Sequence, residues 1–170
     1  MLTHLSIQNF TLVDHLDLDF KAGMTVITGE TGAGKSILLD ALGQALGDRA
    51  DGQRVRSGTK RADIHATFDI SAIERAKRWL ADQELEQEDH PEECLLRRVI
   101  TSEGRSKAYI NGRPVTLQQL RTLGEMLIDI HSQHEHQSLL RRDTHRRLLD
   151  ELAGQNELAQ QVREQFRHWQ

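Results

Sequence analysis

The chain has 170 residues, of which 37% are hydrophobic and 28% are charged, and its formal net charge is −4. This composition excludes collagen-like and low-complexity chains, and it indicates a globular domain large enough to bury a core. Because the chain is acidic overall, any contact with nucleic acid must be a local patch. The single cysteine, Cys94, excludes an internal disulfide framework. We expect a cytoplasmic protein with no membrane partner, because residues 1–10 lack a signal-peptide pattern and no long apolar run follows.

The first 27 residues carry strand patterns. Apolar and polar residues alternate over residues 5–8 and 16–20, which is typical of half-buried strands. Residues 24–27 are instead a short apolar run, which predicts a strand buried on both faces.

The middle of the chain alternates helix and strand patterns. Apolar residues at helical spacing over residues 38–46 predict a helix that ends at Gly47. Asn111-Gly112 predicts a tight turn. We expect further strands at residues 64–70, 94–100, 107–110 and 126–130, and helices that begin at Ser71, reaching about Leu85, and at Thr116.

A glycine-rich stretch directly follows the apolar run and matches G-x-x-x-x-G-K-[ST] in full. Its backbone N–H groups can surround a phosphate, and the positive end of the following helix adds to that field. Lys35 can reach the β- and γ-phosphates of a nucleotide, and the Ser36 hydroxyl is a hard oxygen ligand for Mg²⁺. The predicted nucleotide-binding residues are Gly29, Glu30, Thr31, Gly32, Ala33, Gly34, Lys35 and Ser36.

Hydrolysis requires more than this loop. It needs a second acidic residue for Mg²⁺, usually at the end of an apolar strand, and a group that orients the attacking water. No apolar run of four or more residues ends in two acidic residues. The nearest candidate, Met126–Asp129, is expected to continue as a strand through Ile130. The sequence therefore indicates an incomplete catalytic set.

Several motifs in this order resemble the N-terminal head segment of SMC-like ATPases, in particular those of bacterial double-strand-break repair. In addition to the phosphate loop, the motifs that carry this resemblance are Val55–Gly58, Ala62–Phe68, Gly104–Ser106, Ala108–Arg113 and Ile130–Gln137. The resemblance implies an α/β P-loop NTPase fold. More narrowly, it implies the N-terminal lobe of an ABC/SMC-type ATPase head, with a mixed β-sheet, over residues 1–138. Residues 139–170 would begin a coiled-coil arm.

The resemblance also implies a division of labour. The C-terminal half of such a protein supplies the Walker B carboxylates and the signature motif, and two heads sandwich ATP and Mg²⁺ in a homodimer. By position, Gln133 would be the Q-loop glutamine that contacts Mg²⁺ and the attacking water, with Gln137 as second choice. Lys35 and Gln133 would then be the catalytic residues here. The implied function is ATP-dependent head engagement with DNA binding and tethering in a nucleoid-associated repair protein.

Two clusters of cations lie outside the phosphate loop. Such a cluster is either solvated surface or a contact to the DNA backbone that does not depend on base sequence. The resemblance places Arg56 near nucleotide and DNA. The first cluster, which we predict as the DNA-binding one, consists of Arg49, Arg54, Arg56, Lys60 and Arg61. The second comprises Arg141, Arg142, Arg146 and Arg147.

Other interpretations stay open. Apolar residues spaced alternately by four and three from Leu148 to Trp169 suit a coiled-coil seam or an ordinary amphipathic helix. Three histidines between residues 131 and 136 lack a clear third metal ligand or thiolate, which disfavours zinc. The rival functions are a self-contained P-loop kinase or GTPase, and an ATP-gated DNA-binding clamp that does not hydrolyse ATP.

Overall fold

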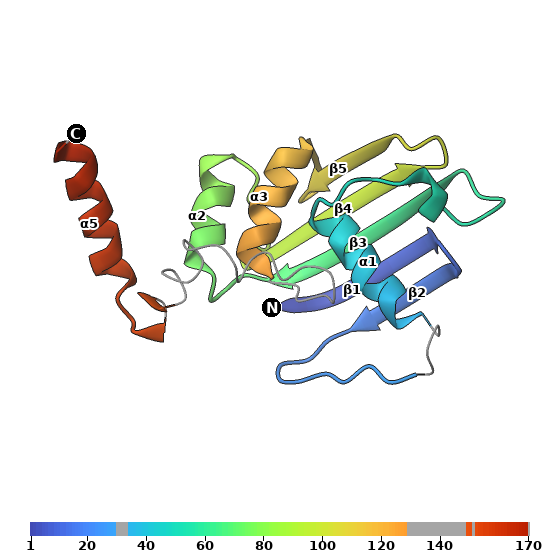
Figure 1. The fold of residues 1–170 in the computed structure, drawn as a ribbon, viewed down its shortest axis with the longest axis horizontal. Coiled ribbons are helices and arrows are strands. Elements are labelled where there is room, and N and C mark those ends of the chain that lie inside the picture. The colour runs from blue at the N-terminus through green and yellow to red at the C-terminus, as the bar shows by residue number, and fades with distance from the viewer. Residues whose placement is uncertain (30–33, 129–148, 151, 170) are drawn as a thin grey trace. The chain divides into compact units, whose positions relative to one another are not determined.

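The computed structural model describes residues 1–29, 34–128, 149–150 and 152–169 (Figure 1). The chain divides into two compact units, Met1–Asp129 and Ile130–Gln170. Among the described residues, no helix is long and apolar enough to cross a membrane.

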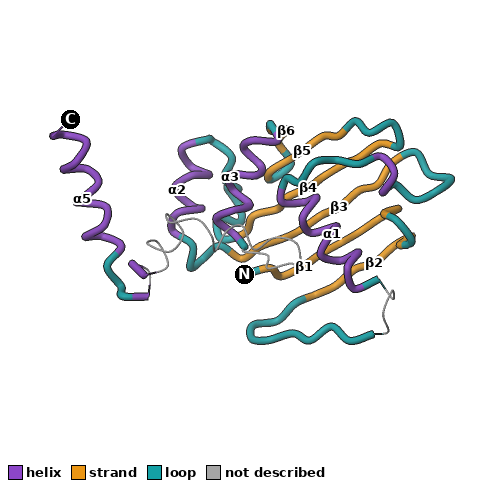
Figure 2. Tube along the Cα trace, viewed as in Figure 1, coloured by secondary structure: helices purple, strands orange, loops and turns teal. Residues whose placement is uncertain are grey.

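The first unit is built on a six-stranded sheet in the order β2-β1-β3-β4-β5-β6, and every neighbouring pair of these strands is antiparallel. Burial alternates from residue to residue along β4 and over most of β3, as expected of strands with one face toward a core. Figure 2 shows these strands side by side. They are β1 (Leu2–Phe10), β2 (Val13–Asp19), β3 (Arg61–Asp69), β4 (Glu93–Thr101), β5 (Ser106–Ile110) and β6 (Arg113–Val115).

Two helices, α1 (Lys35–Leu46) and α3 (Leu117–Leu127), pack on one face of the sheet, and α2 (Glu74–Asp82) packs against α3 (Figure 1). The core lies between this face and the helices. It contains one charged side chain in an otherwise apolar row. From β3 and β4 the buried residues of this row are Ala62, Ile64, Ala66, Phe68, Cys94, Leu96, Arg98 and Ile100.

Glycines allow α1 and α3 to cross closely. A Cβ on Gly124 of α3 would lie 2.8 Å from the carbonyl oxygen of Leu46, at the end of α1. A Cβ on Gly47 would lie 3.1 Å from the backbone of Arg121. Larger residues at either position would push the two helices apart.

The predicted turn and cap are confirmed. Asn111 and Gly112 have φ of 50° and 77°, which are the left-handed values that a two-residue hairpin turn requires. Thr116 caps α3, since its side chain accepts from the N–H of Gln119 while the Gln119 side chain accepts from the N–H of Thr116.

The prediction of a strand at residues 24–27 is wrong. These residues form no strand, and Met24 and Val26 are 92% and 73% exposed. A strand needs a neighbour to pair its backbone groups, and no described strand pairs with this segment.

Two further boundaries differ from prediction. Met126 and Leu127 belong to α3 rather than to a strand, because Leu120, Leu123 and Leu127 continue the buried face of that helix. The helix predicted to begin at Ser71 is the shorter α2. The N-cap of α2 is Ile73, not Ser71, and the N–H of Ser71 donates to the Asp69 carboxylate in the turn that precedes the helix.

In the second unit, α5 spans Asn156–Trp169. A turn precedes it, in which Gly154 has φ of 65° and the N–H of Gln155 donates to the carbonyl of Asp150. The four-three spacing that begins at Leu148 is therefore not carried by one continuous helix. Within α5 the side chains of Val162, Phe166 and Trp169 are exposed.

Candidate nucleotide-binding site

The first turn of α1 is open to a ligand. Its N-cap, Gly34, has φ of 88°, a left-handed conformation that glycine adopts without steric cost. No side chain caps the helix and no acidic residue lies in its first turn. The first N–H groups of a helix lack partners within it, so this end can bind an anion.

Two predicted ligand residues lie on this turn. The Nζ of Lys35 donates a hydrogen bond to the carbonyl oxygen of Gly29, which brings the two ends of the predicted phosphate loop together. Ser36 is exposed one residue further on. Gly29, Gly34, Lys35 and Ser36 are the residues of the predicted phosphate loop that the structure describes. The remaining loop residues Glu30, Thr31, Gly32 and Ala33 lie outside the described residues, as do Gln133 and Gln137.

Among the described residues, the charges on α1 leave its first turn positive. The carboxylate nearest to the loop along α1, Asp40, is paired with Arg54 at 2.6 Å. Its charge is therefore largely compensated, and the side chain of Lys35 and the helix dipole both contribute a positive field at the first turn.

The five cations of the predicted DNA-binding cluster fall into two groups. Two of them bond to other described residues, and the other three are exposed. Besides the Arg54 ion pair, the Arg56 guanidinium donates to the carbonyl of Leu12 at 2.7 Å, which fastens the loop to the β1–β2 turn. Arg49, Lys60 and Arg61 are exposed and form no ion pair within the described part of the chain. These three remain available to a ligand.

The nearest candidate for a second metal carboxylate in the sequence was the run Met126–Asp129. Met126 and Leu127 lie in α3, and Asp129 falls outside the described ranges, as do the histidines between residues 131 and 136. Within residues 1–29, 34–128 and the described part beyond them, no three or more His, Cys, Asp or Glu side chains lie close enough together to hold a metal.

The family model described as AAA domain matches residues 4–168. The chain belongs to the AAA-domain family. Its sequence is 49% identical over 169 residues to the DNA repair protein RecN of Vibrio cholerae, covering 99% of this chain and 30% of that protein. It is 40% identical over 154 residues to RecN of Bacillus subtilis, covering 91% of this chain and 26% of that protein. These matches confirm the predicted resemblance, and the chain spans about 30% of the length of such relatives.

Solved structures share the fold of this AAA-domain chain. A structure titled for ATP-driven dimerization and DNA-stimulated activation of SMC ATPases matches with a TM-score of 0.61 at 20% identity, covering 89% of this chain and 98% of that chain. The SMC head domain from Thermotoga maritima matches with a TM-score of 0.53 at 23% identity, over 71% of this chain and 41% of that chain. At these identities the likeness shows the fold alone, and it confirms the predicted class.

Sequence reasoning missed a charged cluster on the other face of the sheet. Arg97 on β4 donates to both carboxylate oxygens of Asp63 on β3, at 2.9 and 2.5 Å, and His65 lies 3.0 Å from the same carboxylate. Burial alone would raise the pKa of Asp63, but the bonds from Arg97 and His65 outweigh it and hold the pKa well below its ordinary value. The strand register brings the three together, and no local pattern encodes that register.

Proposed function

We propose that this chain is the ATP-binding head segment of a RecN-like SMC-family protein that acts in DNA double-strand-break repair and recombination. The observation that carries the proposal is the open first turn of α1, with Lys35 and Ser36 on it and Gly34 in a left-handed conformation. The similarity to RecN proteins over almost the whole chain supports the repair role.

The phosphate loop supplies binding and charge to this function. Backbone N–H groups of Gly29–Ser36 would hold the β-phosphate, and Lys35 would neutralise charge on the β- and γ-phosphates. The Ser36 hydroxyl and the Gln133 amide would be ligands of Mg²⁺. When bound, Mg-ATP supplies the γ-phosphate whose presence or loss distinguishes two states of the head.

The proposed partners are the C-terminal half of the same protein and a second head. The exposed apolar residues Met24 and Val26 support the first of these, because they lead directly into the phosphate loop and no described strand pairs with them. A strand from the C-terminal half would pair with this segment and bring the Walker B carboxylates beside the loop. A second head would close over ATP, and hydrolysis would release it.

The first experiment measures Mg-ATP binding and phosphate release by the purified, folded chain. We expect saturable binding without appreciable turnover, because the acidic metal ligand is supplied elsewhere. Lys35→Ala should weaken binding at least tenfold, while Lys60→Ala, an exposed lysine outside the loop, serves as the matched control. Unchanged binding by Lys35→Ala would remove the loop from the site, and multiple turnover by the clean chain would favour a self-contained enzyme.

DNA binding is tested separately. The exposed cations Arg49, Lys60 and Arg61 are changed together to alanine, and affinity for duplex DNA is measured at several salt concentrations. Contacts to phosphates predict weaker binding to every sequence and a shallower dependence on salt. Replacement of the already paired Arg54 is less informative, since it also breaks the bond to Asp40. An unchanged salt dependence would show that this cluster is only solvated surface.

A further inference from the structure

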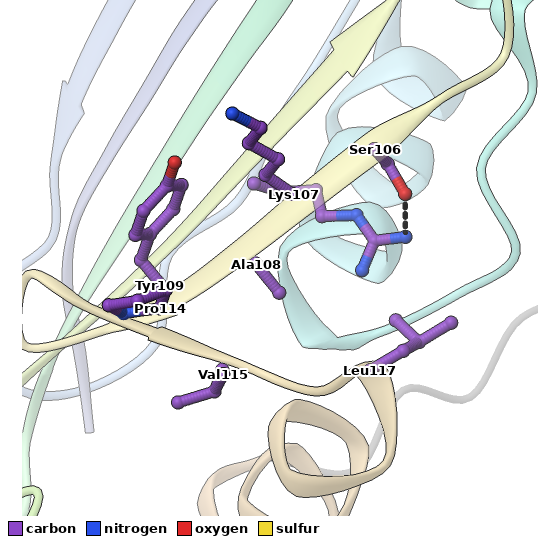
Figure 3. Close-up of a pocket in the computed structure, with 8 residues that line it drawn as sticks. Ser106, Lys107, Ala108, Tyr109, Pro114, Val115 and Leu117 are labelled. Atoms are coloured by element: carbon purple, nitrogen blue, oxygen red, sulfur yellow. Dashed lines mark hydrogen bonds between the residues drawn. The ribbon is translucent and has the colours of Figure 1, made fainter.

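A cavity of about 220 Å³ lies beside β5 and β6, away from the phosphate loop (Figure 3). Its lining includes the polar residues Arg98 and Ser106 and the apolar residues Ala108, Val115 and Leu117. The cavity therefore combines cationic and apolar surface within a few residues.

Arg98 is a buried charge without a counter-charge at bonding distance. It is 1% exposed, and its Nε has no hydrogen-bond partner. Its Nη2 donates to the Ser106 hydroxyl at 2.9 Å, as Figure 3 shows, and lies 3.5 Å from the carbonyl oxygen of Asp48. Within the described ranges no carboxylate forms an ion pair with Arg98. Buried charges are normally paired, so an unpaired guanidinium against a cavity requires an explanation.

Positive charge dominates the surroundings of this guanidinium. Burial and the nearby Arg121 lower the pKa of Arg98, and only Asp48 opposes them. The Lys107 side chain points away from this guanidinium, on the opposite face of β5 (Figure 3). The guanidinium of Arg121 also donates to a backbone carbonyl after α1, the carbonyl of Gly47, at 3.0 Å. Neutral carbonyls accept hydrogen bonds but do not balance the charge.

We propose that this cavity binds a carboxylate carried on a short apolar stem. The anion would pair with the guanidinium of Arg98 and accept from the Ser106 hydroxyl, and bonds between charged partners are the strongest available. The stem would contact Val115 and Leu117. A volume of about 220 Å³ equals roughly seven waters of about 30 Å³ each, which exceeds a bare anion and suits a group of several heavy atoms.

This site is separate from the phosphate loop. Lys35 begins α1, whereas Asp48 follows its last residue, and the 12 residues of α1 span about 18 Å at about 1.5 Å each. A ligand here would therefore bind at the opposite end of α1 from a nucleotide.

The test follows the side-chain Nε–H signal of Arg98 by nitrogen–proton correlation NMR, with the signal assigned through its loss in Arg98→Lys. Sodium butyrate is titrated at constant ionic strength, with butyramide as the uncharged comparison. We expect a saturable shift with butyrate and none with butyramide. The shift should persist in Lys35→Ala, which separates it from binding at the phosphate loop.

Leu117→Trp narrows the cavity without touching the guanidinium, and it should weaken butyrate binding at least fivefold. Leu12→Trp, another exposed leucine, is the matched control. A capped peptide with one glutamate that binds ten times more tightly than butyrate would identify a protein side chain as the ligand, whereas equal or weaker binding would identify a free carboxylate. The proposal is overturned if sodium chloride or butyramide gives the same shift, if the shift does not saturate, or if Leu117→Trp leaves binding unchanged.

Discussion

Replacing Asp63 with asparagine tests whether the charged cluster on the sheet contributes to stability. Asp63 is 7% exposed and accepts two hydrogen bonds from Arg97, at 2.9 and 2.5 Å. The substitution keeps the shape of the side chain but removes the charge, and it replaces one acceptor oxygen with a donor group that faces Arg97.

The expected cost follows from exposure. A hydrogen bond to a charged group contributes about 1.5–3 kcal/mol, and breaking a fully buried pair costs about 3–5 kcal/mol. The Arg97 side chain is 36% exposed, so water can solvate its guanidinium once the partner charge is gone. We therefore expect Asp63→Asn to lower the free energy of unfolding by about 2 kcal/mol.

Urea unfolding as a function of pH measures this cost and its origin. The pKa of Asp63 is lowered in the folded state relative to about 3.9 in the unfolded chain. The charge therefore contributes its full stabilisation above about pH 4, and this contribution is lost as pH falls below that value towards the folded-state pKa. The difference between wild type and Asp63→Asn should be constant near neutral pH and shrink in acid.

Asp19→Asn is the control, because the Asp19 side chain is 89% exposed and pairs only with His4. Such surface pairs contribute up to about 1 kcal/mol. Equal losses in the two variants, or a difference for Asp63→Asn that is unchanged at pH 2.5, would refute the assignment of the stabilisation to the Asp63 charge.

Three further substitutions or labelling tests probe the packing. Gly124→Ala should cost about 2 kcal/mol in thermal unfolding, because its Cβ would crowd the Leu46 carbonyl, whereas Gln118→Ala on the same helix should be nearly neutral. Thr116→Ala removes the cap of α3, and urea unfolding should show a loss of about 1 kcal/mol. Burial raises the pKa of Cys94 to about 12, so iodoacetamide at pH 8 should label it only after unfolding. Rapid labelling of folded chain would contradict its burial.

The elements set by local patterns were predictable. Alternation of apolar and polar residues located β2 and β3, and the pair Asn111-Gly112 located the hairpin between β5 and β6. These signals work because the side-chain period and the turn conformation depend on neighbouring residues alone. The nucleotide site was predictable for the same reason, since its residues are consecutive in the sequence.

Features that depend on distant partners were not predictable. The apolar run at residues 24–27 indicated a buried strand, but burial requires a neighbouring strand that the described residues do not provide. The run that begins at Met126 was ambiguous between helix and strand, as short apolar runs are, and packing of Leu127 decided for the helix. The pairing of Asp63 with Arg97 and the burial of Arg98 depend on strand register, which a single sequence does not reveal.

The charge distribution along α1 connects the stable core with the proposed site. Cations near a helix C-terminus and anions near its N-terminus each stabilise a helix by about 0.3–1 kcal/mol. At the C-terminal end of α1 the cation is supplied from another element, since Arg121 of α3 bonds to the Gly47 carbonyl. At the N-terminal end no acidic residue lies in the first turn, and no side chain caps it. Among the described residues, a side chain therefore complements the dipole of α1 at its C-terminal end only. The unused positive end carries Lys35 and Ser36, which is the arrangement that a bound phosphate would complete.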